Sequence, residues 1–302
     1  MAATHTIAVD DIRVAADDRP AGPGPDRVPL VFLHGAVQTR VIWEAQVAAM
    51  SGTRRVVSCD LRGHGETTLG SRRMSVERLA VDTLTLLDEL HIDRVAVCGI
   101  SLGGMVALEM AEHAPGRVAS LILSNTPTSL SSNRWLRGVV DWLDPQDLLP
   151  FAFRLLGQKR TARIGLAIAS GVVGPQWVGA TARRHFIHGF STMTPEAIVA
   201  TYRAIVDARP VDPKLIRCPT LLITGNGDAP SINAQMDELA RETRNAHVQT
   251  MTAGHVASLD DPTAFSRLLM EFLERHDVPS RQSAHGSKIR NSDTGSSGLP
   301  AG

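Results

Sequence analysis

Residues 99–103 (Gly-Ile-Ser-Leu-Gly) constrain the fold of this chain most, because they have the Gly-x-Ser-x-Gly pattern of a nucleophile elbow. In such a turn a strained serine joins a strand to a helix, and the flanking glycines allow the turn to close. Residues 94–98 are the short apolar run of a buried strand, whereas residues 105–113 have helical composition and precede Pro115-Gly116. This context predicts an exposed nucleophilic serine at Ser101, facing the free N–H groups of the helix that follows.

A serine hydroxyl is a poor nucleophile, so it requires a base and an acid that orients the base. Of the eleven histidines, His255 lies in a loop between an expected strand and an expected helix, late in the chain. That position suits the last member of a Ser, Asp, His order. Asp228 ends an apolar run and should face the crevice at the carboxyl end of a strand. We predict a triad of Ser101, His255 and Asp228; the alternatives are a packed loop histidine and a turn-forming or helix-capping aspartate.

Acyl transfer also needs N–H donors for the oxyanion that develops in the transition state. One donor is expected at Leu102, directly after the nucleophile, and the other at Ala36, in the loop after an early apolar strand. Val37 is the neighbouring alternative to Ala36. The ring of His34 is a candidate substrate contact, although a supporting role beneath this loop is the simpler interpretation.

Four blocks now match one family in order, and the chain resembles the serine α/β-hydrolases. The blocks are residues 33–36 (Leu-His-Gly-Ala), 59–65 (Cys-Asp-Leu-Arg-Gly-His-Gly), 99–104, and 225–228 with 254–255. The resemblance implies structural roles for Asp60, Arg62 and His64. The elbow, residues 124–126 and the final Gly-His loop are similar to those of 3-oxoadipate enol-lactonases and neighbouring small esterases.

The fold class expected is α/β, an α/β-hydrolase fold with a mostly parallel central sheet, helices on both faces and an inserted helical cap. Alternating strand and helix patterns support the parallel sheet independently. Residues 5–15 predict an antiparallel edge hairpin, and the Pro- and Gly-rich residues 17–29 predict a loop. The expected division is a core of residues 1–126 and 213–280, a helical cap of residues 127–212 and a disordered tail of residues 281–302.

In this family such a cap covers the active site and shapes its pocket. Its aromatic side chains are therefore candidate lining residues, and packing inside the cap is the alternative role for each. We single out Trp135, Trp142 and Phe190, and the remaining candidates are Trp177, Phe186 and His188.

Composition narrows the class of protein. The formal net charge is zero, so no electrostatic pattern favours nucleic acid or a membrane as partner. The three cysteines lie in apolar contexts without zinc spacing, so we expect buried thiols and no metal. The first residues lack the pattern of a signal peptide, which predicts a cytoplasmic protein. A homo-oligomer is compatible with the sequence.

These parts predict a hydrolase that cleaves an ester or lactone of a small organic molecule in two acyl-transfer steps, without a cofactor. The same triad serves a cofactor-free perhydrolase or haloperoxidase, and a carbon–carbon bond hydrolase. Outside hydrolysis, a biosynthetic cyclase and a non-catalytic small-molecule binding protein use the same fold. The shape of the pocket determines which of these activities a protein of this fold has.

Overall fold

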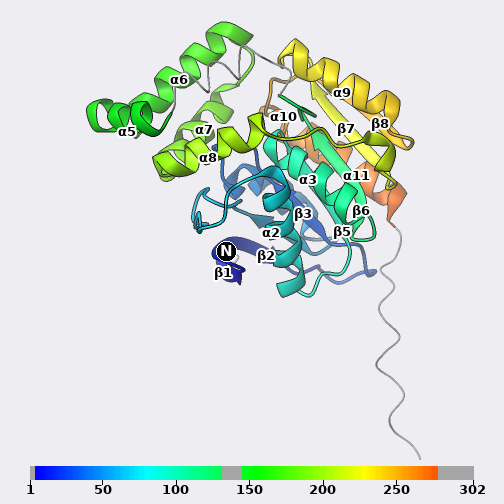
Figure 1. Cartoon of the computed structure of the whole chain (residues 1–302). Coiled ribbons are helices and arrows are strands. Elements are labelled where there is room, and N and C mark those ends of the chain that lie inside the picture. The colour runs from blue at the N-terminus through cyan, green and yellow to red at the C-terminus, as the bar shows by residue number, and fades with distance from the viewer. Residues whose placement is uncertain (1–3, 131–144, 278–302) are drawn as a thin grey trace, which may run out of the picture.

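A single eight-stranded sheet forms the centre of the computed structural model, which describes residues 4–130 and 145–277. Its strand order is β1-β2-β4-β3-β5-β6-β7-β8 (Figure 1). The strand β2 runs antiparallel to β1 and β4, and all other neighbours are parallel. The strands are β1 (Thr4–Val9), β2 (Ile12–Arg19), β3 (Leu30–Leu33), β4 (Val56–Cys59), β5 (Val95–Ile100), β6 (Val118–Ser124), β7 (Thr220–Gly225) and β8 (Ala246–Met251).

Helices cover both faces of this sheet, as the alternation of its side chains requires. Along β3, Val31 and Leu33 pack into one apolar cluster, whereas Leu30 and Phe32 pack into another on the opposite face. The first cluster contains side chains of α2 (Val76–Glu89), α3 (Leu102–His113) and α9 (Pro230–Glu242). The second contains side chains of α1 (Glu44–Met50), α10 (Ala257–Asp260) and α11 (Pro262–His276). The predicted α/β-hydrolase architecture is therefore confirmed (Figure 1).

Four helices lie between β6 and β7, and we call them the cap helices. They are α5 (Pro145–Leu156), α6 (Gln158–Val173), α7 (Ala180–Thr192) and α8 (Pro195–Val206). The α8 helix begins as its sequence predicts, because the Thr194 side chain accepts the N–H of Ala197 and Pro195 occupies the first turn. A side chain at Gly189 of α7 would overlap the carbonyl oxygen of Val37, so this helix lies directly on the loop after β3. Of the cap helices, α7 thus lies over the carboxyl end of β3.

The second strand is longer than its composition predicts. Residues 17–29 were expected to form a loop, but β2 continues to Arg19 because Asp17 and Arg19 pair with Ser58 and Val56 of β4. Pairing with a neighbouring strand satisfies the backbone groups here, and this outweighs the low strand propensity of aspartate.

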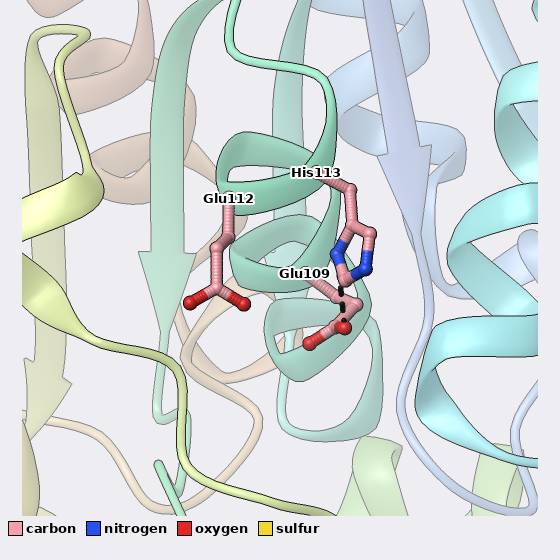
Figure 2. Close-up of side chains that lie close together, drawn as sticks. All are labelled: Glu109, Glu112 and His113. Carbon is pink, nitrogen blue, oxygen red and sulfur yellow. Dashed lines mark ion pairs between the residues drawn. The ribbon is translucent and has the colours of Figure 1, made fainter.

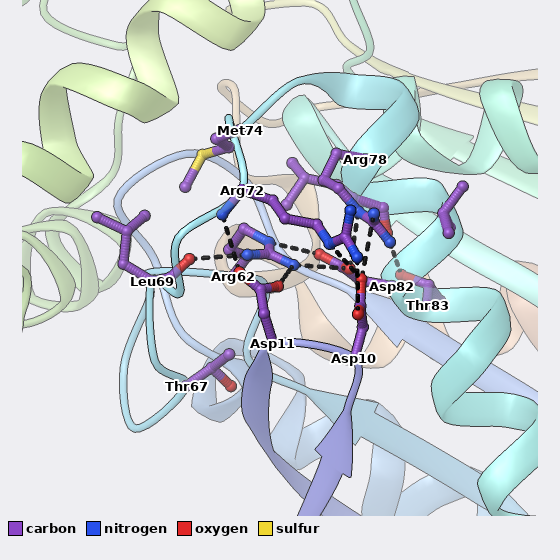
Figure 3. A network of polar contacts seen from close by, with 12 residues as sticks. Asp10, Asp11, Arg62, Thr67, Leu69, Arg72, Met74, Arg78, Asp82 and Thr83 are labelled. Atoms are coloured by element: carbon purple, nitrogen blue, oxygen red, sulfur yellow. Dashed lines mark hydrogen bonds and ion pairs between the residues drawn. The ribbon is translucent and has the colours of Figure 1, made fainter.

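A buried ion network holds the loop after β4 (Figure 3). The fully buried guanidinium of Arg62 donates to Asp82 of α2 at 2.7 Å and to Asp11 of the β1–β2 turn at 2.7 Å. The hydrogen bond from Arg62 also holds the pKa of Asp11 below its usual value, although burial opposes that shift. Asp60 accepts the backbone N–H groups of Arg40 and Glu66, so these residues fix the loop that carries His64.

Within the described ranges, none of the helices is both long and apolar enough to cross a membrane.

Candidate active site

Ser101 occupies a strained turn between β5 and α3. Its φ of 52° and ψ of −116° are rarely adopted by a residue with a side chain. The motif glycines are required sterically: a side chain at Gly99 would overlap the carbonyl of Gly103, and one at Gly103 would overlap that of Leu33. The helix α3 can therefore start against the ends of β3 and β5, which places Ser101 in front of its first turn.

His255 and Asp228 form a hydrogen-bonded pair beside the carboxyl ends of β7 and β8. The Nδ1 atom of His255 lies 3.0 Å from both carboxylate oxygens of Asp228. The Asp228 side chain is completely buried, and that of His255 is 13% exposed. Because an ionised carboxylate only accepts hydrogen bonds, Nδ1 must carry the proton. The Nε2 atom of His255 is then left with its lone pair, as a general base requires.

The remaining partners of Asp228 keep it ionised. Asn125 Nδ2 donates to Oδ2 at 2.9 Å, while Trp177 Nε1 and the backbone N–H of Ala229 donate to Oδ1 at 3.1 and 2.7 Å. Burial alone would raise the pKa of Asp228, but the neighbouring His255 and the hydrogen bonds from Asn125 and Ala229 outweigh it and lower the pKa. The site therefore presents a buried negative charge behind the imidazole.

Ser101 and His255 line one cavity of about 200 Å³ beneath the cap. In the described part of the chain no hydrogen bond joins the Ser101 hydroxyl to the imidazole. Hydrogen bonds of this kind are often long in unliganded enzymes and tighten when substrate binds. The two side chains are thus brought to the same cavity from different strands, with the imidazole already held by Asp228.

The two expected oxyanion donors flank the same cavity. Ala36 and Leu102 both line it, and Leu102 begins α3, where backbone N–H groups have no intrahelical partner. Val37 has a φ of 51°, an outlier for a β-branched residue, which strains the loop that carries Ala36. Gln38 braces this loop, because its Oε1 accepts the N–H of Gly35 at 2.9 Å.

His34 was a candidate substrate contact. It lies beneath this loop, however, and does not line the cavity. Its ring is fully buried, with Nε2 accepting the N–H of Leu61 at 3.0 Å and Nδ1 lying 2.8 Å from the carbonyl oxygen of Gly35. Burial lowers the pKa of His34 to about 4, so the ring is neutral. Its contacts are those of a supporting residue.

The described cap aromatic residues divide between the two roles considered from the sequence, pocket lining and packing inside the cap. Phe190 packs inside the cap against Phe153 and Phe186, with ring centroids 5.7 and 6.2 Å apart, and is 7% exposed. Phe186 and Trp177, which were also candidates, line the cavity. Phe190 is kept from the cavity because its ring closes the cluster between α5 and α7. Trp135 and Trp142 lie outside the described residues.

Two polar side chains of the cavity have no signature in the sequence. Tyr202 of α8 is the only tyrosine of the chain, and burial raises its pKa to about 12, so it remains a hydrogen-bond donor. Gln38 also reaches the cavity, and since its oxygen is bound to Gly35, its amide nitrogen is left to donate. Among the described lining residues there is no Asp, Glu, Lys or Arg.

A separate cluster of Glu109, Glu112 and His113 lies at the other end of α3 (Figure 2). Arg209 Nη2 lies 2.8 Å from a Glu109 oxygen and 2.7 Å from a Glu112 oxygen, and His113 Nδ1 lies 3.1 Å from Glu109. The guanidinium already pairs with both carboxylates. We therefore assign no metal to this cluster.

Comparison with known proteins places this geometry in a family. The model of the family described as "alpha/beta hydrolase fold" matches residues 28–262. The chain is 25% identical over 254 residues to 3-oxoadipate enol-lactonase 2 of Acinetobacter baylyi, covering 83% of this chain and 90% of that protein. It is 29% identical over 262 residues to the pimeloyl-[acyl-carrier protein] methyl ester esterase of Nitrosospira multiformis, covering 83% and 95%. The crystal structure of the enol-lactonase from Burkholderia xenovorans LB400 superposes with a TM-score of 0.75 at 25% identity, over 89% of this chain and all of that chain. The resemblance drawn from the sequence is confirmed.

Proposed function

This chain belongs to the alpha/beta hydrolase fold family, and we propose that it hydrolyses an ester or a lactone of a small organic molecule. One observation carries the proposal: the Asp228–His255 pair and the strained Ser101 meet at one cavity, next to two backbone donors. The names of the relatives, a lactonase and a methyl ester esterase, support the same class of reaction.

The reaction proceeds in two acyl-transfer steps. His255 Nε2 takes the proton of Ser101 as the serine oxygen attacks the substrate carbonyl, and Asp228 holds the imidazolium that forms. The N–H groups of Ala36 and Leu102 stabilise the oxyanion. His255 then donates its proton to the leaving oxygen, which departs as an alcohol or, in a lactone, stays tethered to the acyl group. Water, deprotonated by the same imidazole, releases the acid and restores Ser101.

The walls of the cavity favour a small, uncharged acyl group. Its volume of about 200 Å³ lies below the usual range for drug-sized ligands, roughly 300 to 1,000 Å³. Burying a carboxylate without a cation is costly, and the described walls offer none. Tyr202 and the Gln38 amide supply neutral donors for a second oxygen of the substrate, such as the ring oxygen of a lactone.

Labelling with a fluorophosphonate and a substrate panel test this proposal. We expect one label, on Ser101, and turnover of p-nitrophenyl acetate, p-nitrophenyl butyrate and γ-valerolactone that exceeds turnover of a succinate monoester. Ser101→Ala should abolish both, since loss of a triad serine costs on the order of 10⁶ in kcat. A label on another residue, or an active Ser101→Ala protein, would refute the mechanism. Peracid formation from acetate and peroxide without ester hydrolysis would favour a perhydrolase.

A further inference from the structure

The outer surface of the cap exposes an unusual number of large apolar side chains. Six of the nine exposed large hydrophobic residues in the described structure belong to α5 and α6, whereas Val81, Leu215 and Val248 lie on separate elements. Five of the six are at least 48% exposed. We define the outer cap face as these five residues together with the cations of the two helices: Phe151, Leu155, Ile164, Ile168, Val172, Arg154, Lys159, Arg160 and Arg163.

The apolar residues of α6 share one side of the helix. Arg160, Ile164, Ile168 and Val172 follow one another at intervals of four, so they form a single row along its surface. The opposite side of α6 buries Ala162, Leu166 and Ser170 against the rest of the cap. The helix is therefore apolar on two faces, and only one of them has a partner within the described structure. Figure 1 shows α5 and α6 at the end of the cap farthest from the sheet.

The described charged side chains of this surface are all positive. Residues 149–192 contain six Lys and Arg residues and no Asp or Glu, although the whole chain has a formal net charge of zero. Arg154, Lys159, Arg160 and Arg163 are exposed, and none of them makes an ion pair in the described part of the chain. Three of these cations occupy the first two turns of α6, where the helix dipole disfavours positive charge. The stability of the helix does not explain their position.

We propose that the outer cap face docks on an anionic lipid surface. Apolar side chains on a basic helical face enter the boundary between headgroups and acyl chains, while lysine and arginine bind the lipid phosphates. A second copy of the chain suits the face poorly, because a two-fold contact would bring together two surfaces that are both positively charged. The net charge of zero had indicated no membrane partner, because acidic residues elsewhere in the chain balance the positive charge of residues 149–192. This docking is independent of the chemistry proposed for Ser101.

Flotation of the full-length protein with vesicles tests the proposal. We expect binding to vesicles of phosphatidylcholine and phosphatidylglycerol at 3:1, weak binding to phosphatidylcholine alone, and release as salt is raised. The double variant Ile164→Ser/Ile168→Ser should bind at least about tenfold more weakly. Arg160→Gln/Arg163→Gln should lose about fivefold for each cation.

Matched variants elsewhere on the surface serve as controls. Val81→Ser/Val248→Ser removes two valines that are each 44% exposed, and Arg217→Gln/Arg244→Gln removes two exposed arginines outside the cap. Both should bind vesicles like the original protein, and all four variants should keep its hydrolysis of a soluble ester. Absence of vesicle binding, or equal losses in cap and control variants, would overturn the proposal. So would a dimer in vesicle-free solution that Ile164→Ser/Ile168→Ser abolishes, since it would assign the face to a second copy.

Discussion

The indole of Trp177, in the loop between α6 and α7, donates from Nε1 to Oδ1 of Asp228 at 3.1 Å, so a cap residue directly binds the proposed triad acid. The backbone carbonyl of the same tryptophan accepts the N–H of His255 at 2.6 Å. A side chain at Gly254 would overlap this carbonyl, which explains the glycine before His255. The position of the α6–α7 loop and the geometry of the His255–Asp228 pair are therefore coupled.

Replacing Trp177 by phenylalanine should lower kcat about threefold to tenfold, because one hydrogen bond to a charged carboxylate is lost while the ring and the backbone contact remain. Steady-state kinetics and the rate of labelling by a small phosphonate measure the effect. Trp43→Phe is the matched control, since the buried indole N–H of Trp43 has no hydrogen-bond partner. If Trp177→Phe changes only KM, the tryptophan acts on substrate binding alone.

Asp228→Asn should reduce kcat by about 10² to 10⁴, less than loss of Ser101, because the aspartate orients and stabilises the imidazole without touching substrate. The measurement is kcat on an activated ester, with circular dichroism as the check on folding. Full activity of this variant would require another acid. Asp207 and Asp212, the two acids that precede Asp228 in the chain, are engaged elsewhere, with Arg73 and with the N–H of Lys214.

Stability should fall as the pH drops from 7 to 5. Burial lowers the pKa of His34 to about 4 and that of His64 to about 3, while an unfolded histidine titrates near 6.5. Between those values the unfolded chain binds protons that the folded protein does not, so the free energy of unfolding decreases with falling pH. Each ring should contribute about 2 kcal/mol of this loss at pH 5.

Urea unfolding of the original protein and of His64→Gln at both pH values measures that slope. The variant removes one of the two rings, which lie 5.0 Å apart, and should lose about half of the pH dependence that these two rings cause. Since most carboxylates titrate below pH 5, an unchanged slope in His64→Gln would mean that other groups cause the acid sensitivity.

Phe186→Ala should raise kcat/KM for hexanoate esters relative to acetate esters, because this ring lines the small cavity. Phe190→Ala should instead lower the free energy of unfolding by about 3 to 5 kcal/mol without that shift in preference, since its ring fills the core of the cap. Comparing acyl-chain preference and urea unfolding in the two variants separates the roles. Equal changes in preference would place both rings in the pocket.

The sequence by itself determined the parts of this protein that depend on neighbouring residues. Gly99 permits a turn that a side chain would block by overlap with the carbonyl of the nearby Gly103, so strand, elbow and helix could be predicted around Ser101. Parallel strands bring their carboxyl ends to one edge, which is why Asp228 and His255 could be expected near that serine.

The tertiary structure alone decided which side chains surround Ser101, Asp228 and His255. Trp177 meets Asp228 across 51 positions of the chain, Tyr202 reaches the cavity from α8, and Phe190 turns into the cap instead. These positions depend on how the cap helices pack on the loop after β3, and no local pattern encodes that packing. The same holds for the outer cap face: each Ile and Arg is ordinary in the sequence, and only the packing of α5 and α6 leaves them exposed together.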